Sequence, residues 1–246
     1  MSAHEQLPSG WQGILTAIAL LASSSAAIWP FRRRDRAVDA EGEAPDQVQE
    51  EEAANQPDFF DWALRLALLG KPDKAMARFK RAIDITPEDA AAHYNLGLCL
   101  HHEGKYSDAL ESYSRAAELA PDSSDIRANI GLAMLETGDI AGAIEHLKKA
   151  VELAPDDAEA SFDLGCALAA NNELDDAAER FREAAKADPK DPQIRFNLAV
   201  TLVKADKPDQ AENDFRDFLA LAGDRFSEQR AFAEKFLAER SSGEAT

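Results

Sequence analysis

Apolar and polar residues alternate with a helical period from about residue 57 onward, and the pattern itself recurs every 34 residues. Within one period, small and apolar positions three or four residues apart form two blocks separated by a short polar turn, which is typical of two amphipathic helices. Four series of residues carry the recurrence. They are Pro87, Pro121, Pro155 and Pro189; Ala75, Ala109, Ala143, Ala177 and Ala211; Phe79, Tyr113, Leu147, Phe181 and Phe215; and Ala82, Ala116, Ala150 and Ala184. The sequence therefore predicts an all-α chain of repeated helical hairpins.

The period that begins at residue 90 illustrates the expected hairpin. Its first helix is predicted over Ala91–Glu103 and its second over Tyr106–Leu119. Gly104 lies between them and is expected to end the first helix with a positive φ. The equivalent positions in the other periods also hold residue types that tolerate left-handed geometry. These are Gly70, Gly138, Asn172 and Asp206.

Small residues at fixed positions of each period predict close contact between its two helices. Gly97 and Ala109 should allow the helices to approach where a larger side chain would separate them. Tyr113 is expected to fill the space toward the next period. One hairpin cannot bury its apolar face alone, so neighbouring hairpins must stack.

These residues resemble the tetratricopeptide repeat, whose 34-residue pattern combines Leu-Gly, Tyr, Gly, Ala, an aromatic, Ala and Pro. The resemblance covers five repeats, at 56–89, 90–123, 124–157, 158–191 and 192–225. The fifth repeat departs from the pattern at Phe218 and Gly223. The resemblance implies a right-handed superhelical solenoid, which a capping helix at 226–241 would close before a short disordered tail at 242–246.

The resemblance also implies a concave groove lined by the first helix of each repeat. The groove positions that we expect to bind a peptide are Phe60, Asp61, Tyr94, Asn95, Leu98, Asn129, Leu132, Phe162, Asp163, Phe196 and Asn197. An Asn amide offers both a donor and an acceptor, so the asparagines could hold a peptide backbone. The aromatic residues would hold peptide side chains. The alternative is that asparagine is simply common at this position in the family.

The stretch before the repeats predicts a membrane anchor, in the form of a single transmembrane helix. No charged residue occurs between Glu5 and Arg32, and a Trp stands near each end of the apolar segment at 11–30. The anchor set is Trp11, Trp29, Arg32, Arg33 and Arg34. Because basic residues follow the segment and none precedes it, the repeats would be cytoplasmic. Residues 1–10 would be a short tail. The alternative is a cleaved signal peptide, which would make the protein periplasmic or secreted.

The charge and the residue content of the sequence limit the kinds of ligand and partner that we expect. Residues 31–56 are acidic and lack apolar periodicity, which predicts a flexible linker. The formal charge of −19 disfavours nucleic acid and favours partners with basic segments. The chain has two cysteines, Cys99 and Cys166, which are too far apart for a zinc motif and are expected to be buried. No catalytic or phosphate-binding motif occurs, so we expect no enzyme activity, metal or cofactor.

We interpret the chain as a membrane-anchored protein-interaction scaffold that helps to assemble a membrane-associated complex, with partner segments bound in the groove. The alternative is a self-associating structural protein, in which the fifth repeat with Phe218, or the linker, docks into the groove of a second copy. The sequence does not identify the partner.

Overall fold

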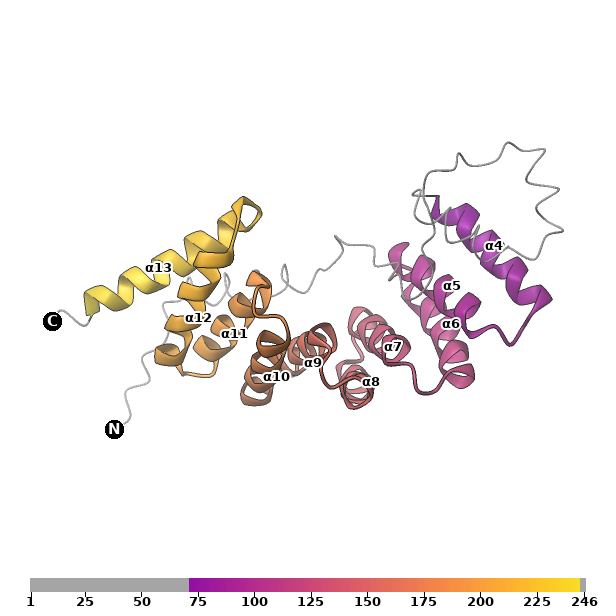
Figure 1. The fold of residues 1–246 in the computed structure, drawn as a ribbon, viewed down its shortest axis with the longest axis horizontal. Helices are drawn as coiled ribbons and strands as arrows, with labels where there is room; N and C mark the ends of the chain where they lie inside the picture. Colours follow the sequence, from indigo (N-terminus) through magenta and orange to yellow (C-terminus); the bar gives the residue numbers. More distant parts are fainter. Residues whose placement is uncertain (1–70, 244–246) are drawn as a thin grey trace. The chain divides into compact units, whose positions relative to one another are not determined.

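The computed structural model describes residues 71–243, which contain ten α-helices, one 3₁₀ turn and no strand (Figure 1). These residues form two compact units, the first unit at 71–153 and the second unit at 154–243. The first unit contains α4 Pro72–Ile85, α5 Ala90–His102, α6 Tyr106–Leu119, α7 Ser124–Thr137 and α8 Ile140–Leu153. The second contains α9 Ala158–Ala170, α10 Leu174–Ala187, α11 Pro192–Lys204, α12 Pro208–Leu221, η1 Asp224–Phe226 and α13 Ser227–Gly243. The predicted all-α class is confirmed.

The helices alternate between two roles within the 34-residue period. We call α5, α7, α9 and α11 the A helices, and α4, α6, α8, α10 and α12 the B helices. Inside each unit, every helix packs against the next one along the chain. The B helix predicted over Tyr106–Leu119 has those bounds, and the A helix before it begins and ends one residue earlier than expected.

Each A helix begins with a side-chain cap at the same position of the repeat. Asp89 accepts hydrogen bonds from the backbone N–H groups of Ala91 and Ala92, at 3.0 and 3.1 Å. The caps of the other three A helices follow at intervals of 34 residues and are Ser123, Asp157 and Asp191. Such caps satisfy backbone donors that have no partner in the first turn of a helix. They fix where each A helix starts.

The turns between the A and B helices use left-handed backbone, as predicted. Gly104 and Gly138 have φ values of +71° and +87°. Asn172 and Asp206, at the equivalent positions of the next two repeats, have φ values of +63° and +58°. This conformation reverses the chain in a few residues, so the B helix can pack back against the A helix that precedes it.

A methyl group at Gly138 should destabilise the first unit. We expect Gly138→Ala to lower the free energy of unfolding by about 1–2 kcal/mol, because a Cβ is disfavoured at positive φ. Gly223 is the matched control, since its φ is −86° and no atom lies within 4 Å of the place that its Cβ would occupy. Denaturant unfolding measures both variants. A Gly138→Ala variant as stable as Gly223→Ala would contradict the prediction.

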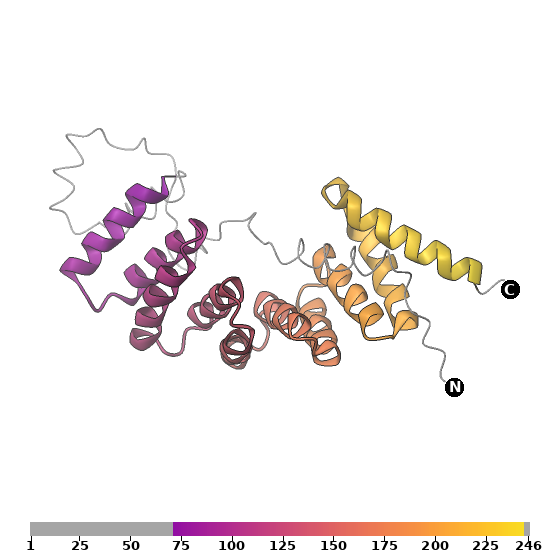
Figure 2. The ribbon, with the colours of Figure 1, turned by 180° about the vertical axis from the view of Figure 1, so that it is seen from behind.

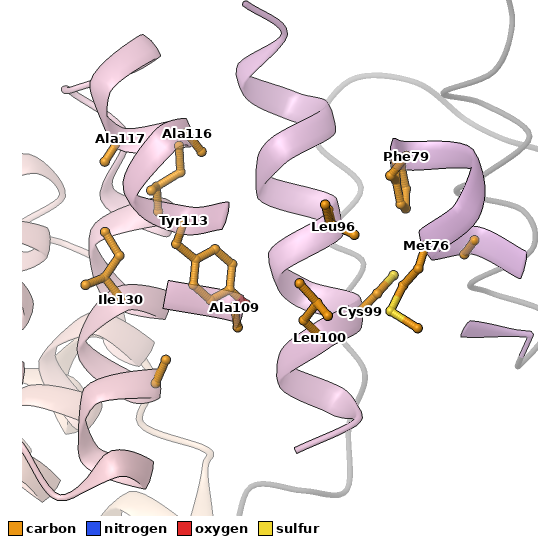
Figure 3. Packing of buried hydrophobic residues seen from close by; sticks show 13 residues of the cluster. Met76, Phe79, Leu96, Cys99, Leu100, Ala109, Tyr113, Ala116, Ala117 and Ile130 are labelled. Atoms are coloured by element: carbon orange, nitrogen blue, oxygen red, sulfur yellow. The ribbon is translucent and has the colours of Figure 1, made fainter. Parts of the chain in front are cut away.

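The core of the first unit is a cluster of apolar side chains from α4, α5, α6 and α7. Figure 3 shows Met76 and Phe79 of α4 on one side of α5, near Leu96 and Cys99, and Tyr113 of α6 on the other side of that helix. A Cβ on Gly97 would lie 2.5 Å from two ring carbons of Tyr113. The ring of Tyr113 therefore occupies the space that Gly97 leaves open within its own repeat, and it belongs to the same core cluster as Ile126 and Ile130 of the next repeat.

The hydroxyl group of Tyr113 is buried without a hydrogen bond. The side chain has no exposed surface, and its hydroxyl has no hydrogen-bond partner among the described residues. Burial raises the pKa of this hydroxyl well above its usual range, with smaller contributions from Tyr94 and Cys99. Phenylalanine stands at the equivalent position of three other repeats, at Phe79, Phe181 and Phe215.

Removing this hydroxyl should stabilise the protein. We expect Tyr113→Phe to raise the free energy of unfolding by about 1 kcal/mol, because an unpaired buried polar group costs roughly 1–3 kcal/mol. Thermal unfolding of the variant beside the parent chain measures the change. A clearly lower unfolding temperature would show that the hydroxyl has a partner.

The second unit is closed by α13, which lies against α12 at the end of the repeats (Figure 2). Phe232 and Phe236 of α13 are buried, and the ring of Phe236 lies 4.8 Å from that of Phe215. Arg230 of α13 donates hydrogen bonds to the carbonyls of Leu219 and Ala222, at 3.1 and 2.8 Å. It thereby satisfies carbonyl groups at the end of α12 that have no partner in their own helix.

The burial of Phe218 contradicts the expectation that this residue docks into the groove of a second copy. Its side chain has no exposed surface, and its ring contacts those of Phe196 and Phe226 at 5.0 and 6.0 Å. In this structure it cannot also dock into the groove of a second copy. The larger side chain that replaces alanine here completes the contact with the closing elements of the chain.

The predicted localisation also needs correction. Within residues 71–243, no helix combines the length and the apolar character needed to cross a bilayer. This finding contradicts the prediction of a single-pass membrane protein with cytoplasmic repeats. The anchor on which that prediction depended lies outside the described residues, as do Phe60 and Asp61 of the expected groove. Its residues are Trp11, Trp29, Arg32, Arg33 and Arg34.

Candidate protein-binding face of the A helices

The expected groove residues within the described chain all lie on A helices. In the first unit, α5 carries Tyr94, Asn95 and Leu98, and α7 carries Asn129 and Leu132. All except Asn95 are half-buried, so part of each of their side chains stays open to solvent. We call these five residues the first A face. It combines an aromatic ring, two leucines and two amides on adjacent A helices.

The asparagines of this position each bond to their own helix. The Asn95 amide Nδ2 donates to the carbonyl of Ala91 at 2.8 Å. Asn129 Nδ2 donates to the carbonyl of Asp125 at 2.9 Å, and Asn197 Nδ2 in the second unit donates to that of Gln193, also at 2.9 Å. This local bond occupies one amide N–H of each asparagine. It means that the amides do not keep both of their polar ends available.

A hydrogen bond joins the two A helices of the first unit at the centre of the first A face. Asn129 Nδ2 also donates to the hydroxyl of Tyr94, at 3.1 Å. The Tyr94 ring lies 5.9 Å from the ring of Tyr113, which belongs to the core. Packing against the Tyr113 ring and the hydrogen bond from Asn129 therefore both restrict the Tyr94 side chain. The sequence predicted that both residues lie in the groove, but nothing in it indicated a hydrogen bond between them.

The second unit brings together fewer of the expected groove residues. Phe162 and Asp163 of α9 are half-buried, and the ring of Phe162 lies 5.5 Å from that of Phe181. Phe196 of α11 is only 2% exposed and contacts Phe215, Phe218 and Phe232. Its ring belongs to the core beneath α13, so we do not include it in the binding face. Asn197, 8% exposed, lies next to it. We call Phe162, Asp163 and Asn197 the second A face.

One pair of equivalent repeat positions carries different charges in the two units. Arg195 of α11 forms an ion pair with Asp214 of α12, with 2.9 Å between Nη1 and Oδ1. Two repeats earlier, the same positions hold Arg127 and His146. Arg127 Nε and His146 Nδ1 are buried atoms without a hydrogen-bond partner among the described residues. The guanidinium thus faces an imidazole where the later repeat supplies a carboxylate.

This arrangement should make the first unit sensitive to acid. Burial and the charge of Arg127 lower the pKa of His146 below its usual 6.5, against opposing effects of Glu145 and Asp139. Burial, and then the neighbouring His102, lower the pKa of His101. Below pH 6.5 the unfolded chain therefore binds protons before the folded chain does, and the free energy of unfolding falls as the pH falls. The loss levels off below the folded-state pKa values.

Denaturant unfolding between about pH 7.5 and about pH 5 checks this prediction. We expect stability to decrease over that range, and His146→Gln to reduce the decrease because Gln does not titrate. A stability that rises as the pH falls through 6.5 would contradict the depressed pKa values.

Cys99 is buried, as expected, whereas Cys166 is half-buried, which corrects the expectation for that residue. Burial raises the pKa of Cys99 to about 12 and raises that of Cys166 well above its usual value. The thiolate that would bind a metal or attack a substrate is therefore disfavoured at both positions. Within residues 71–243, no group of three or more histidine, cysteine, aspartate or glutamate side chains is placed to hold a metal ion.

The fold and this face define an all-helical repeat protein built from helical hairpins. Sequence comparison identifies the repeat. A model of the tetratricopeptide repeat matches residues 60–124 and 128–192, more than half of the chain, and a second model of the same repeat matches residues 168–217. The chain therefore belongs to the tetratricopeptide-repeat family, whose members are generally protein-binding scaffolds. No curated protein matches the chain.

Solved structures confirm the fold. YrrB, described as a tetratricopeptide-repeat protein with an unusual peptide-binding site, is 22% identical and has a TM-score of 0.63, over 76% of this chain and 96% of its own. MamA from Desulfovibrio magneticus RS-1 is 23% identical with a TM-score of 0.63, over 66% and 92%. The protein TTC0263 from Thermus thermophilus is 22% identical with a TM-score of 0.57, over 74% and 98%. At these identities the likeness extends to the fold alone.

Proposed function

We propose that this protein is an adaptor that holds extended segments of partner proteins on its A helices and thereby brings those partners together in a complex. The first A face is the main support. It presents the ring of Tyr94 and the half-buried side chains of Leu98 and Leu132 on two helices that Asn129 joins. Half-buried rings and leucines supply contact area at low cost in conformational entropy, because packing already restricts them.

The likeness to YrrB supports a peptide as the ligand, since that protein is described as having a peptide-binding site. The presence of two compact units supports the gathering role. Each unit has A helices of its own, so each can hold one segment, and two segments held by one chain are at high effective concentration to one another.

Site-specific photo-crosslinking in the cells that make the protein tests the proposal. A photoreactive residue at Leu132, on the first A face, should form crosslinks to partner proteins. The control position is Lys148, which is exposed on the B helix α8. Competition by a synthetic segment of the captured partner should remove the crosslinks. Crosslinks that form equally at Lys148 and resist competition would contradict binding on the A helices.

A further inference from the structure

The amide groups of the A faces have a fixed direction. A backbone carbonyl can only accept a hydrogen bond, so the amide atom that faces it must be nitrogen. In Asn95, Asn129 and Asn197 this nitrogen lies 2.8–2.9 Å from the carbonyl four residues earlier. Asn129 directs its second N–H at the hydroxyl of Tyr94. Its donors are therefore both used, and only its Oδ1 is left for a ligand.

Asn129 is half-buried, whereas Asn95 and Asn197 are each 8% exposed, and the oxygens of all three amides keep some surface. Within residues 71–243, none of the three Oδ1 atoms receives a hydrogen bond, and none is a fully buried unpaired atom. Each amide thus has an acceptor that its own helix does not use. An acceptor in this situation gains most from a ligand that brings N–H donors.

The same repeat position across the whole sequence agrees with an acceptor role. It holds Asp61, Asn95, Asn129, Asp163 and Asn197 in the five repeats. Aspartate and asparagine share a side-chain oxygen acceptor, but only asparagine has a donor. Because aspartate fills the position in two repeats out of five, the amide donor seen in the asparagines is not required in every repeat. The feature common to all five is the oxygen.

We propose that each A face by itself recognises an extended partner segment rich in arginine and lysine, whose N–H groups bind the Asn and Asp oxygens of that face. This inference rests on the proposed function and names the partner's chemistry. Arginine brings five N–H donors. The aliphatic stems of arginine and lysine can pack on Tyr94, Leu98 and Leu132 in the first A face, and on the ring of Phe162 in the second. The charge of −19 attracts such a segment over distance and speeds its association.

Binding of short labelled peptides to the full chain tests the inference. The peptides share an alanine and leucine frame and differ at alternate positions, which carry arginine, glutamine or glutamate. We expect the arginine peptide to bind about tenfold more tightly than the glutamine peptide, and the glutamate peptide to bind most weakly. Equal affinity for all three would overturn the inference and leave the proposed function standing. Failure of every peptide to bind would overturn both.

Substitutions separate an acceptor role from a donor role. Asn95→Asp and Asn129→Asp keep the oxygen and remove the amide donor, so affinity for the arginine peptide should be kept or raised. Asn95→Leu and Asn129→Leu remove both and should weaken binding about tenfold. Ser107→Asp adds the same charge on the exposed side of α6 and is the control for charge alone. Aspartate variants that bind as weakly as the leucine variants, while unfolding like the parent chain, would overturn the proposal.

A second set of variants keeps the test decisive if changes in α5 or α7 unfold the first unit. Asp163→Asn on the second A face keeps an acceptor, and Asp163→Leu removes it. We expect binding of the arginine peptide to survive the first change with a modest loss and to fall about fivefold or more with the second. An equal loss in both variants would show that charge alone matters and would overturn the acceptor role.

Discussion

A chain that ends after Gly223 should lose the cooperative unfolding of its second unit and associate in solution. The deletion removes Phe232 and Phe236, which are buried against α12, and leaves the rings of Phe215 and Phe218 open to water. Replacing one buried phenylalanine by alanine costs about 3–5 kcal/mol, so the loss of two approaches the whole stability of a typical domain, about 5–15 kcal/mol. Calorimetry and light scattering measure the two effects.

A milder deletion provides the control for this experiment. A chain that ends after Arg240 keeps both phenylalanines and keeps the ion pair of Arg240 with Glu212, whose Nε and Oε1 atoms are 2.6 Å apart. It should unfold like the parent chain. If the long deletion also unfolds at the parent temperature and stays monomeric, α13 is not the element that closes the core.

Valine at Gly97 should strongly destabilise the first unit. Its Cβ would lie 2.5 Å from Cδ1 and Cε1 of Tyr113, closer than nonbonded carbons approach in proteins. The side chain of Tyr113 has no exposed surface and belongs to the core cluster, so a valine at Gly97 would have to displace packed side chains or helices. We expect a loss of about 3 kcal/mol in the free energy of unfolding, the upper part of the range for overpacked cores.

The cause of that loss can be isolated with a double-mutant cycle. In a Tyr113→Ala background the ring is absent, so Gly97→Val should cost much less than in the parent chain. Chemical denaturation of the four proteins gives the coupling. The same cost in both backgrounds would mean that valine acts on the helix itself and not through the ring.

The repeat period predicted local structure well because local structure depends on residue types at fixed spacing. The left-handed turns at Gly104, Gly138, Asn172 and Asp206 are confirmed. The helix at Tyr106–Leu119 is confirmed to the residue. The tetratricopeptide-repeat fold follows from the same signals. The superhelical curvature expected from the family concerns the arrangement of the two units and stays a prediction.

The candidate site was harder to predict, because a position in a repeat does not say what covers it. Phe196 occupies the same position as Tyr94 and Phe162, but the ring of Phe232 in α13 covers it. The 34-residue pattern ends before α13, so the pattern could not include this contact. The direction of the Tyr113 ring and the bond between Asn129 and Tyr94 depend on side-chain conformation, which spacing alone does not determine.

The outer surface of α13 limits where further helical hairpins could be added to the protein. Its side chains that face away from α12 are small or charged, and include Glu228, Ala231, Glu234, Lys235 and Glu239. A further hairpin added after this helix would find no apolar surface on which to pack. Growth of the protein by duplication, in evolution or by engineering, would therefore have to insert new hairpins upstream of the fifth repeat and carry the terminal helix along unchanged.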